Sequence, residues 1–390
     1  MTGRRFFVVA AALASATPAA AHHGFGNFDR NGEVALEGIV TGIDFVNPHS
    51  YLYLDVNAAG GLRVAWRCEM RSATTLRRSG WSPEMFKQGE LVTITGAPDR
   101  NDPNSCYLST IVFADGSSAD RYGQLSKAAA PRVVAERVLR LPSGEPNLAG
   151  DWAPEQLVMT DPRGRGGALV PLSQAESFEA GANIPDNARQ YRTRDVALTP
   201  AGQQAADGFE TYNPQHNSRM RCETTSIIFD WTYDGAVNRV TQTADTVTLE
   251  YGQLGFTRTI HLNMTEHPAN LAPSRAGHSL GRWENDVLVV DTIGFAPGVL
   301  SPPVLHTDRL HIVERFSLDP TGRALLRSYT ADDPVYFSGT YSGSDMLGVA
   351  DVPYSPDECN ELTFVDYSKG AQPAQTEPPV AAKPWWKFWD

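Results

Sequence analysis

The chain has only four cysteines in 390 residues, and no two of them form a CxxC pair. Zinc ribbons and thioredoxin-like redox centres need such closely spaced cysteines, so both are disfavoured. The sequence also lacks a P-loop and a Rossmann glycine fingerprint, which argues against nucleotide cofactors. Basic residues are scarce, because 33 Lys and Arg face 45 Asp and Glu and leave a formal net charge of -12. Phosphates bind to basic surfaces, so nucleic acid and anionic membranes are both disfavoured as the main partner.

The first residues have the pattern of a secretory signal peptide. Arg4 and Arg5 form a positive start, residues 6–13 are apolar, and 19–21 form an A-x-A cleavage site. This stretch is too short to span a bilayer, and no later apolar run approaches a transmembrane helix. We therefore expect residues 1–21 to be removed by cleavage after Ala21, leaving a periplasmic or secreted protein. The alternative is a buried N-terminal helix.

Export would place the four cysteines in an oxidising compartment. An even number of cysteines there indicates disulfides more often than metal ligands. Three pairings exist, and we expect the two that join cysteines of the same domain, Cys68 with Cys106 and Cys222 with Cys359.

Cleavage after Ala21 would leave His22 and His23 at the new N-terminus. The free amine, the His22 imidazole and a third nitrogen from His49 would form a T-shaped donor set that suits copper(II). The amine, a backbone amide and His23 are an alternative chelate. Copper is the one cofactor that the sequence suggests, and the competing interpretation is a loose end without a metal.

Residues 22–117 predict a small β-barrel. Strands are expected at 34–45, 50–56 and 62–68. A short helix at 72–79, which Gly80 ends, follows them, and two further strands are expected at 91–95 and 107–113. This order is typical of an OB-type five-stranded barrel.

This region contains four short motifs: His-His-Gly-Phe at 22–25, Asn-Pro-His at 47–49, Trp-Arg-Cys-Glu at 66–69 and Gly-Trp at 80–81. Together they resemble a family of small exported bacterial proteins of unknown function. The resemblance implies a periplasmic address and supports the domain boundary, but it implies no activity.

A linker over 118–147 leads to a second domain at 148–368, predicted to be a larger antiparallel β-barrel or sandwich. Its opening, Gly150-Asp151-Trp152, resembles that of lipocalin-like barrels, in which the tryptophan closes one end. Thr199 and Pro200 open a short helix. The chain is thus mainly β, with further strands expected at 227–231, 237–241, 246–251, 257–263, 277–284, 287–292, 310–317, 324–330 and 335–341.

The second domain also resembles a set of large secreted bacterial proteins of unassigned function. The resemblance covers about 148–366 and depends on motifs at 277–283, 288–292, 311–316, 333–334 and 359–361. The tail at 369–390 is disordered by composition and ends in tryptophans between lysines. We expect this aromatic end to pack on the chain's own barrel or on another periplasmic or membrane protein.

The densest polar cluster lies on the hairpin at 277–292. His278, Arg282 and Asp291 are the candidate catalytic residues, as an acid, an anion clamp, and a base or orienting carboxylate. Arg282 and Asp291 share a face only in certain registers, and the alternative is that Arg282 pairs with a carboxylate to hold the hairpin. Serine-hydrolase chemistry is disfavoured, because His278 and Ser279 are neighbours on a strand and point apart.

Trp283, His261 and Glu314 are the candidate ligand-binding residues. Five of the nine histidines fall within 261–311, which suggests a metal or proton-transfer site, although no pair has the spacing of a zinc motif. His311 and Glu314 are three apart on a predicted strand, so they point to opposite faces.

Three functions follow from these observations. The first is a periplasmic binding protein whose larger barrel takes a small, largely apolar molecule, oriented by polar residues around His278 and Arg282. An enzyme that uses His278, Arg282 and Asp291 for isomerisation, elimination or hydrolysis of such a molecule is the second. The third is copper binding by His22, His23 and His49.

Overall fold

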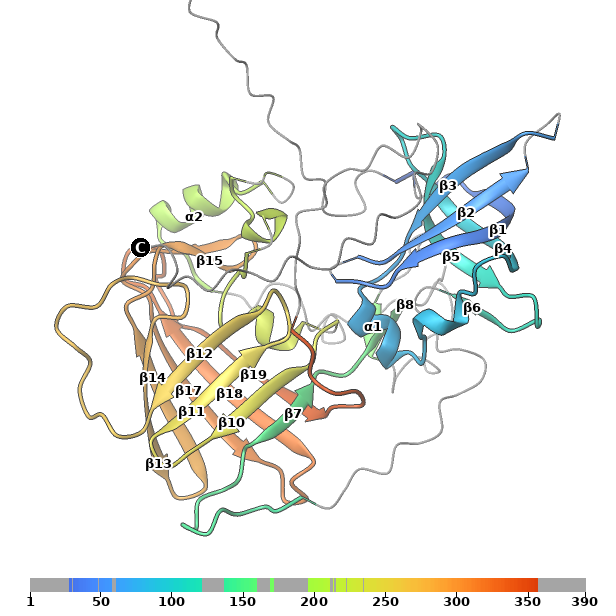
Figure 1. The fold of residues 1–390 in the computed structure, drawn as a ribbon. Coiled ribbons are helices and arrows are strands. Elements are labelled where there is room, and N and C mark those ends of the chain that lie inside the picture. The colour runs from blue at the N-terminus through green and yellow to red at the C-terminus, as the bar shows by residue number, and fades with distance from the viewer. Residues whose placement is uncertain are drawn as a thin grey trace, which may run out of the picture.

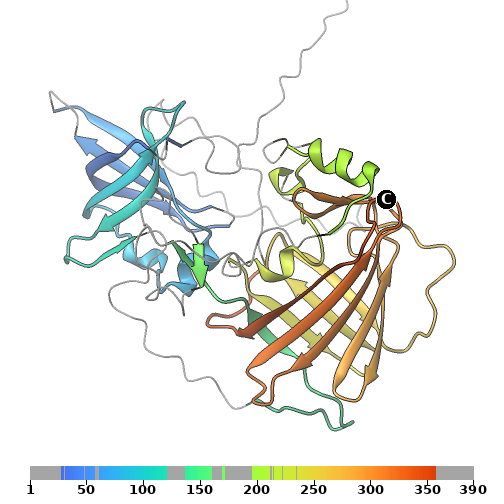
Figure 2. The same cartoon turned by 180° about the vertical axis from the view of Figure 1, so that it is seen from behind.

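The computed structural model describes residues 28–356 apart from 30, 48, 58–60, 121–136, 160–168, 172–195, 211–212, 214, 222 and 234. It contains two β-barrels, the smaller formed by the first part of the chain (Figure 1). The view from behind shows the same division (Figure 2).

The N-terminal barrel has the predicted OB-like order. Its strands pair in the order β3-β2-β1-β4-β5, and a parallel contact between β3 and β5 closes the ring, while the short β6 (Ser118–Asp120) extends β5. The helix α1 (Ala73–Arg78) and the 3-10 helix η3 (Pro83–Met85) separate β3 from β4. The strands are β1 (Val34–Asp44), β2 (Tyr51–Asn57), β3 (Arg63–Glu69), β4 (Leu91–Pro98) and β5 (Ser105–Val112).

Helix α1 begins and ends where the sequence predicts. The Ser72 hydroxyl accepts a hydrogen bond from the Thr75 amide, and Gly80 follows the helix with a φ of +87°, a left-handed conformation that favours glycine. Leu76 is 2% exposed and packs in the barrel core. The helix therefore covers one side of the barrel.

A disulfide joins Cys68 and Cys106, which face each other at the β3–β5 pairing that closes the ring. This confirms one of the two predicted pairings. Cys222 and Cys359 both lie outside the described residues.

The C-terminal barrel is a closed ring of nine strands. A ring with an odd number of strands cannot alternate throughout, and the exception is β12 with β13, which run parallel. The predicted barrel is confirmed, but it is not fully antiparallel. The strands, in ring order, are β10 (Asn238–Gln242), β11 (Thr246–Tyr251), β12 (Phe256–His261), β13 (His278–Glu284), β14 (Val287–Ile293), β17 (His311–Leu318), β18 (Ala324–Asp332), β19 (Tyr341–Val349) and β7 (Gly150–Ala153).

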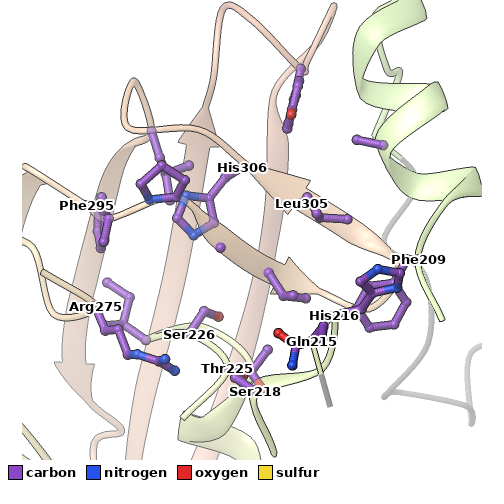
Figure 3. A pocket seen from close by; sticks show the side chains of 18 of the residues that line it. Phe209, Gln215, His216, Ser218, Thr225, Ser226, Arg275, Phe295, Leu305 and His306 are labelled. Atoms are coloured by element: carbon purple, nitrogen blue, oxygen red, sulfur yellow. The ribbon is translucent and has the colours of Figure 1, made fainter. Parts of the chain in front are cut away.

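Short elements gather at one end of this barrel. The hairpin of β15 (Gly298–Ser301) and β16 (Val304–His306) lies there with α2 (Pro200–Asp207) beside it (Figures 1 and 3). Thr199 caps α2 as predicted, by accepting a hydrogen bond from the Gly202 amide. A side chain at Gly202 would collide with the Tyr336 carbonyl, so glycine allows the close approach. A separate two-stranded sheet pairs β8 (Leu157–Met159) with β9 (Leu169–Pro171).

The predicted strand at 227–231 is wrong. Residues 227–229 form a turn that leads into the 3-10 helix η7 (Asp230–Thr232). The turn and the helix together insert Ile227, Ile228 and Trp231 into the barrel, each with at most 3% exposure. Buried Asp230 holds the turn by accepting from the amides of Thr225 and Ser226. We call residues 224–233 the plug. The strand expected at 335–341 is also wrong, because it starts only at Tyr341.

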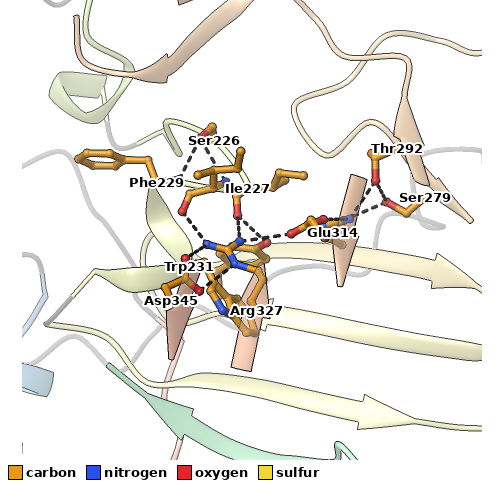
Figure 4. Close-up of polar contacts among 12 residues, drawn as sticks. Ser226, Ile227, Phe229, Trp231, Ser279, Thr292, Glu314, Arg327 and Asp345 are labelled. Carbon is orange, nitrogen blue, oxygen red and sulfur yellow. Dashed lines mark hydrogen bonds and ion pairs between the residues drawn. The ribbon is translucent and has the colours of Figure 1, made fainter. Parts of the chain in front are cut away.

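A buried ionic network attaches the plug to the barrel wall (Figure 4). Arg327 is 1% exposed, donates to the carbonyls of Ile227 and Ile228, and pairs with Asp345 at 2.6 Å and Glu314 at 3.2 Å. Glu314 pairs on its other side with buried Arg258. The interior of this barrel is therefore filled by side chains rather than open to a ligand.

The two barrels contact each other through the end of α1. Arg78, 8% exposed, donates to Asp351 at 2.9 Å and to the Pro154 carbonyl at 2.6 Å. The Gln156 side chain donates back to the Arg78 carbonyl at 2.9 Å. In the described part of the chain, no helix has the length and apolar character that crossing a membrane requires.

Replacing Arg327 by Met should lower the free energy of unfolding by about 3–5 kcal/mol, because it leaves buried carboxylates uncompensated and frees the plug. Chemical denaturation measures the change. Arg323→Met, at an exposed position just before β18, is the control and should stay within about 0.5 kcal/mol of the parent. Equal effects of the two changes would contradict a role for the network.

Candidate functional site

The central hairpin sets which predicted site residues share a face. Strands β13 and β14 pair Leu280 with Asp291 and Arg282 with Val289, and Asn285 turns the chain with a φ of +55°. Because facing residues point the same way, His278, Arg282 and Asp291 all lie on the outer face of the barrel. The predicted catalytic set thus lies on the wall, not in the barrel interior.

Four histidines and one carboxylate meet on this wall, and we call them the wall cluster. His267 Nδ1 lies 2.9 Å from His278 Nδ1, and His267 Nε2 lies 2.9 Å from Asp291 Oδ1. His311 Nε2 lies 2.8 Å from Asp291 Oδ2. The ring of His261 stacks on that of His278, with 5.1 Å between centroids. Strands β12, β13, β14 and β17 and the connection between β12 and β13 contribute these residues.

The hydrogen bonds fix the tautomers of neutral histidines in the cluster. A carboxylate only accepts, so His267 and His311 each donate from Nε2 to Asp291. His267 Nδ1 is then an acceptor, and the proton between the two facing nitrogens belongs to His278 Nδ1. Asp291 therefore orients His267, and His267 orients His278.

The charges of the cluster shift two pKa values. Partial burial disfavours the Asp291 carboxylate, but the hydrogen bonds and charges of His311 and His267 outweigh it, so the pKa of Asp291 is lowered. Burial lowers the pKa of His278 below 6.5, and the neighbouring His267 and His261 lower it further. An ionised carboxylate beside a neutral His278 is the state that follows at neutral pH.

Arg282 does not join the wall cluster. It donates to Glu284 at 2.7 Å, and Arg315 pairs with the same carboxylate at 3.0 Å, which fits the alternative that Arg282 holds the hairpin. The predicted ligand residues separate as well. Trp283 packs against the barrel core and Glu314 is fully buried inside, opposite to His311 as expected.

Residues 277–281 spell G-x-S-x-G, the pattern of a nucleophile elbow, which sequence reasoning overlooked. The context is not that of an elbow, because the serine lies within strand β13 rather than at a strand-to-helix turn. Ser279 is fully buried and accepts a hydrogen bond from Arg258 at 2.9 Å. Its hydroxyl therefore belongs to the interior network.

The predicted copper ligands are only partly described. His49 lies 2.6 Å from Glu69. Burial disfavours the His49 cation, but Glu69 outweighs burial and raises the pKa of His49 above 6.5. His22 and His23 lie outside the described residues. Among the residues that are described, no three or more His, Cys, Asp or Glu are already arranged to hold a metal ion.

A cavity of about 510 Å³ lies between the plug, α2 and the β15–β16 hairpin (Figure 3). Its walls are mainly apolar, with Phe295, Leu305 and Tyr336 among the lining side chains. This is within the size range of small-molecule sites, about 300–1,000 Å³. The cavity lies outside the barrel interior and away from the wall cluster.

Two hydroxyls in the cavity lining lack hydrogen-bond partners. Ser218 and Thr225 are 8% and 7% exposed, and neither side-chain oxygen has a partner among the described residues. Buried polar atoms are nearly always paired in folded proteins. Both residues belong to the lining of the cavity, so these two unpaired oxygens lie close to it.

His306 adds a third polar group. It is 6% exposed, and its Nδ1 donates to the Thr307 carbonyl at 2.9 Å, which leaves Nε2 as an acceptor. Nε2 lies beside Gly298, where an added Cβ would come within 3.4 Å of it. Glycine keeps that side of the ring open.

The charged and imidazole side chains that line the described part of the cavity are all basic. Arg221, Arg275, His216 and His306 are among the lining residues, and no acidic residue is among those described. Glu223, just outside the lining, pairs with both Arg275 and Arg221. The described lining therefore supplies basic groups in a chain that is acidic overall.

The family comparison matches the N-terminal part of the chain. Residues 10–106 match the model of a family of unknown function, DUF6152. That match supports the resemblance noted for the N-terminal part, and nothing identifies the C-terminal part. No curated protein matches the chain.

A solved structure, a complex of TiaS with a transfer RNA and ATP, is 16% identical over 22% of this chain. The aligned part is 19% of that protein, and the TM-score is 0.17. A similarity of this size carries no argument about fold or function.

Sequence reasoning missed the cavity, and it grouped the histidines of the wall cluster without the contacts that link them. His267 lies in a connection without periodicity, so no pattern linked it to Asp291. The lining of the cavity comes from segments that are far apart in sequence and mostly irregular.

Nitrogen NMR of the histidine rings should show His267 and His311 protonated at Nε2, and His278 protonated at Nδ1, near neutral pH. Asp291→Asn should remove this preference from His311, whose tautomer depends on that carboxylate alone. His216, which is exposed, serves as the internal control. A His267 ring protonated at Nδ1 in the parent chain would contradict the hydrogen-bond chain.

Burial lowers the pKa of His306 below 6.5, against smaller opposing effects of the Thr307 carbonyl and Asp333. The unfolded chain then takes up a proton at His306 before the folded chain does, so acid destabilises the fold as pH falls below 6.5. The loss between pH 7.5 and 5.5 should be smaller in His306→Asn, whose amide keeps the bond to Thr307. Urea denaturation at both pH values checks this, and identical losses would refute it.

Proposed function

We propose that the protein is an exported binding protein, and that the cavity beside the plug takes a small, largely apolar molecule with an anionic end. The observation that carries the proposal is the pair of buried hydroxyls of Ser218 and Thr225, two residues of the cavity lining, which have no hydrogen-bond partner among the described residues. An unpaired buried hydroxyl costs about 1–3 kcal/mol, and a ligand that bonds to it recovers part of that cost.

The chemical class of the ligand follows from the lining. Aromatic and aliphatic side chains from α2, the hairpin and the plug provide apolar contact, which dominates in small-molecule sites. The guanidinium groups of Arg275 and Arg221 are in the lining, and such groups form charge-assisted hydrogen bonds with a carboxylate or sulfonate group. His306 Nε2 accepts a hydrogen bond from a hydroxyl or amide of the ligand.

This proposal moves the binding site away from the residues named from sequence. The barrel interior is filled by the plug and its network, and His278 and Arg282 face the outer wall. General acid/base catalysis by His278, Arg282 and Asp291 stays a prediction, as do copper binding at the N-terminus and a partner for the C-terminal tail.

The proposal can be tested with two fluorescent probes of similar apolar bodies, anilinonaphthalene sulfonate and neutral phenylnaphthylamine. The sulfonate should bind about tenfold more tightly, because the lining is basic and a charge-assisted hydrogen bond to it contributes more than a neutral one. Ala205→Trp, which fills the cavity from α2, should abolish binding, whereas Ala201→Trp on the exposed side of the same helix should not. Equal binding by both tryptophan variants would refute the cavity as the site.

A second pair of substitutions tests the hydroxyls. Thr225→Val and Ser218→Ala should each weaken sulfonate binding by about fivefold, because each lost bond contributes about 1 kcal/mol. The same changes should leave the free energy of unfolding unchanged or raise it, because they remove an unpaired buried polar group. A loss of stability together with unchanged binding would contradict the assignment.

A further inference from the structure

Four imidazoles lie together on the outer wall of the barrel, and the proposed ligand site does not use them. His267 and His278 bring two ring nitrogens within 2.9 Å of each other. We propose that this pair binds a divalent transition-metal ion of the copper(II) or nickel(II) type, with Asp291 as the orienting carboxylate.

The hydrogen bond that orients a metal-binding histidine is already present. Such histidines usually donate their other ring nitrogen to a carboxylate, which fixes the tautomer that presents a lone pair to the metal. His267 does so, because Nε2 donates to Asp291 and leaves Nδ1 as an acceptor. A metal ion takes the place of the proton between His267 and His278, and that proton moves to His278 Nε2, so both rings stay neutral.

The ring nitrogens favour a particular type of metal. Bonds from a metal to imidazole nitrogen are about 2.0–2.1 Å, so two nitrogens at a right angle are about 2.9 Å apart and two at the tetrahedral angle about 3.4 Å. The hydrogen-bonded nitrogens at 2.9 Å are already close enough to share one ion, and imidazole ligands suit copper(II) and nickel(II). Each ring must rotate to turn its lone pair from the partner nitrogen toward a common point.

The surroundings supply room, further donors and negative charge. A groove of about 500 Å³ adjoins the cluster and is lined by His267 and Asp291 together with Met264 and Glu266. Water or the Glu266 carboxylate would complete the coordination from the groove. His261, stacked on His278, is a third imidazole within reach of a ring rotation. Two carboxylates beside the site offset the charge of the ion.

The experiment is a copper(II) titration of the full chain after removal of residues 1–21, followed by calorimetry and by electron paramagnetic resonance, which counts coordinated nitrogens. Copper could also bind at the mature N-terminus, so a second version with one residue added before His22 is titrated in parallel. We expect that blocked version to retain one copper site with at least two imidazole nitrogens.

Substitutions in the blocked version locate the site. His267→Gln and His278→Gln should each weaken binding at least tenfold, and Asp291→Asn by about tenfold, as for other residues that orient a metal ligand. Glu37→Gln, at an exposed position on β1 of the other barrel, is the control and should bind as the parent does. Thermal unfolding of each variant, compared with the parent, confirms that the barrel is intact.

Two results would overturn the proposal. One is a blocked chain that binds no copper, which would leave the N-terminus as the site. The other is unchanged affinity in folded His267→Gln and His278→Gln, which would place the metal on other residues.

Discussion

The larger barrel depends on the ion pairs and hydrogen bonds of the Arg327 guanidinium group. It is buried inside the ring, neutralised by Asp345 and Glu314, and bonded to two carbonyls of the plug. A cation in that position is tolerable only because each of its partners is also held there. The same contacts keep the plug inserted, so the interior of the barrel becomes core. Binding and chemistry are thereby left to its outer wall and capped end.

The odd number of strands has a second consequence. Because β12 and β13 are parallel, the chain must travel back along the barrel between them, through residues 262–277. That connection carries His267 onto the wall cluster at one end and Arg275 into the lining of the cavity at the other. Both candidate sites therefore depend on a segment that a fully antiparallel barrel would not have.

Regular elements could be predicted from the sequence and contacts between irregular ones could not. The OB-like order, the α1 and α2 caps, the Cys68–Cys106 pair and the central hairpin all follow from local period, turn chemistry or composition. The plug was misread as a strand, because Ile227 to Trp231 is apolar on both faces whether it pairs in a sheet or fills a barrel. Only the Asp230 carboxylate, which bonds to two nearby amides, separates the two cases.

The same distinction between regular and irregular segments applies to the site residues. His278 and Asp291 were found because both lie on the hairpin, whose period is visible. Their link is His267, which lies in a segment without a period. Arg282, equally visible on the hairpin, pairs with Glu284 two residues away and is not part of the cluster. Proximity in sequence thus identified the wall, but not which side chains on it act together.

The two candidate sites differ in how completely their polar groups are paired. On the wall, both oxygens of Asp291 and both nitrogens of His267 have partners, so a metal ion there must displace a proton that is already bonded. In the cavity, the hydroxyls of Ser218 and Thr225 have no partner among the described residues. A small organic molecule in the cavity can therefore recover part of the cost of the unpaired hydroxyls. Metal binding on the wall depends instead on how strongly the ion competes with the proton for the two ring nitrogens.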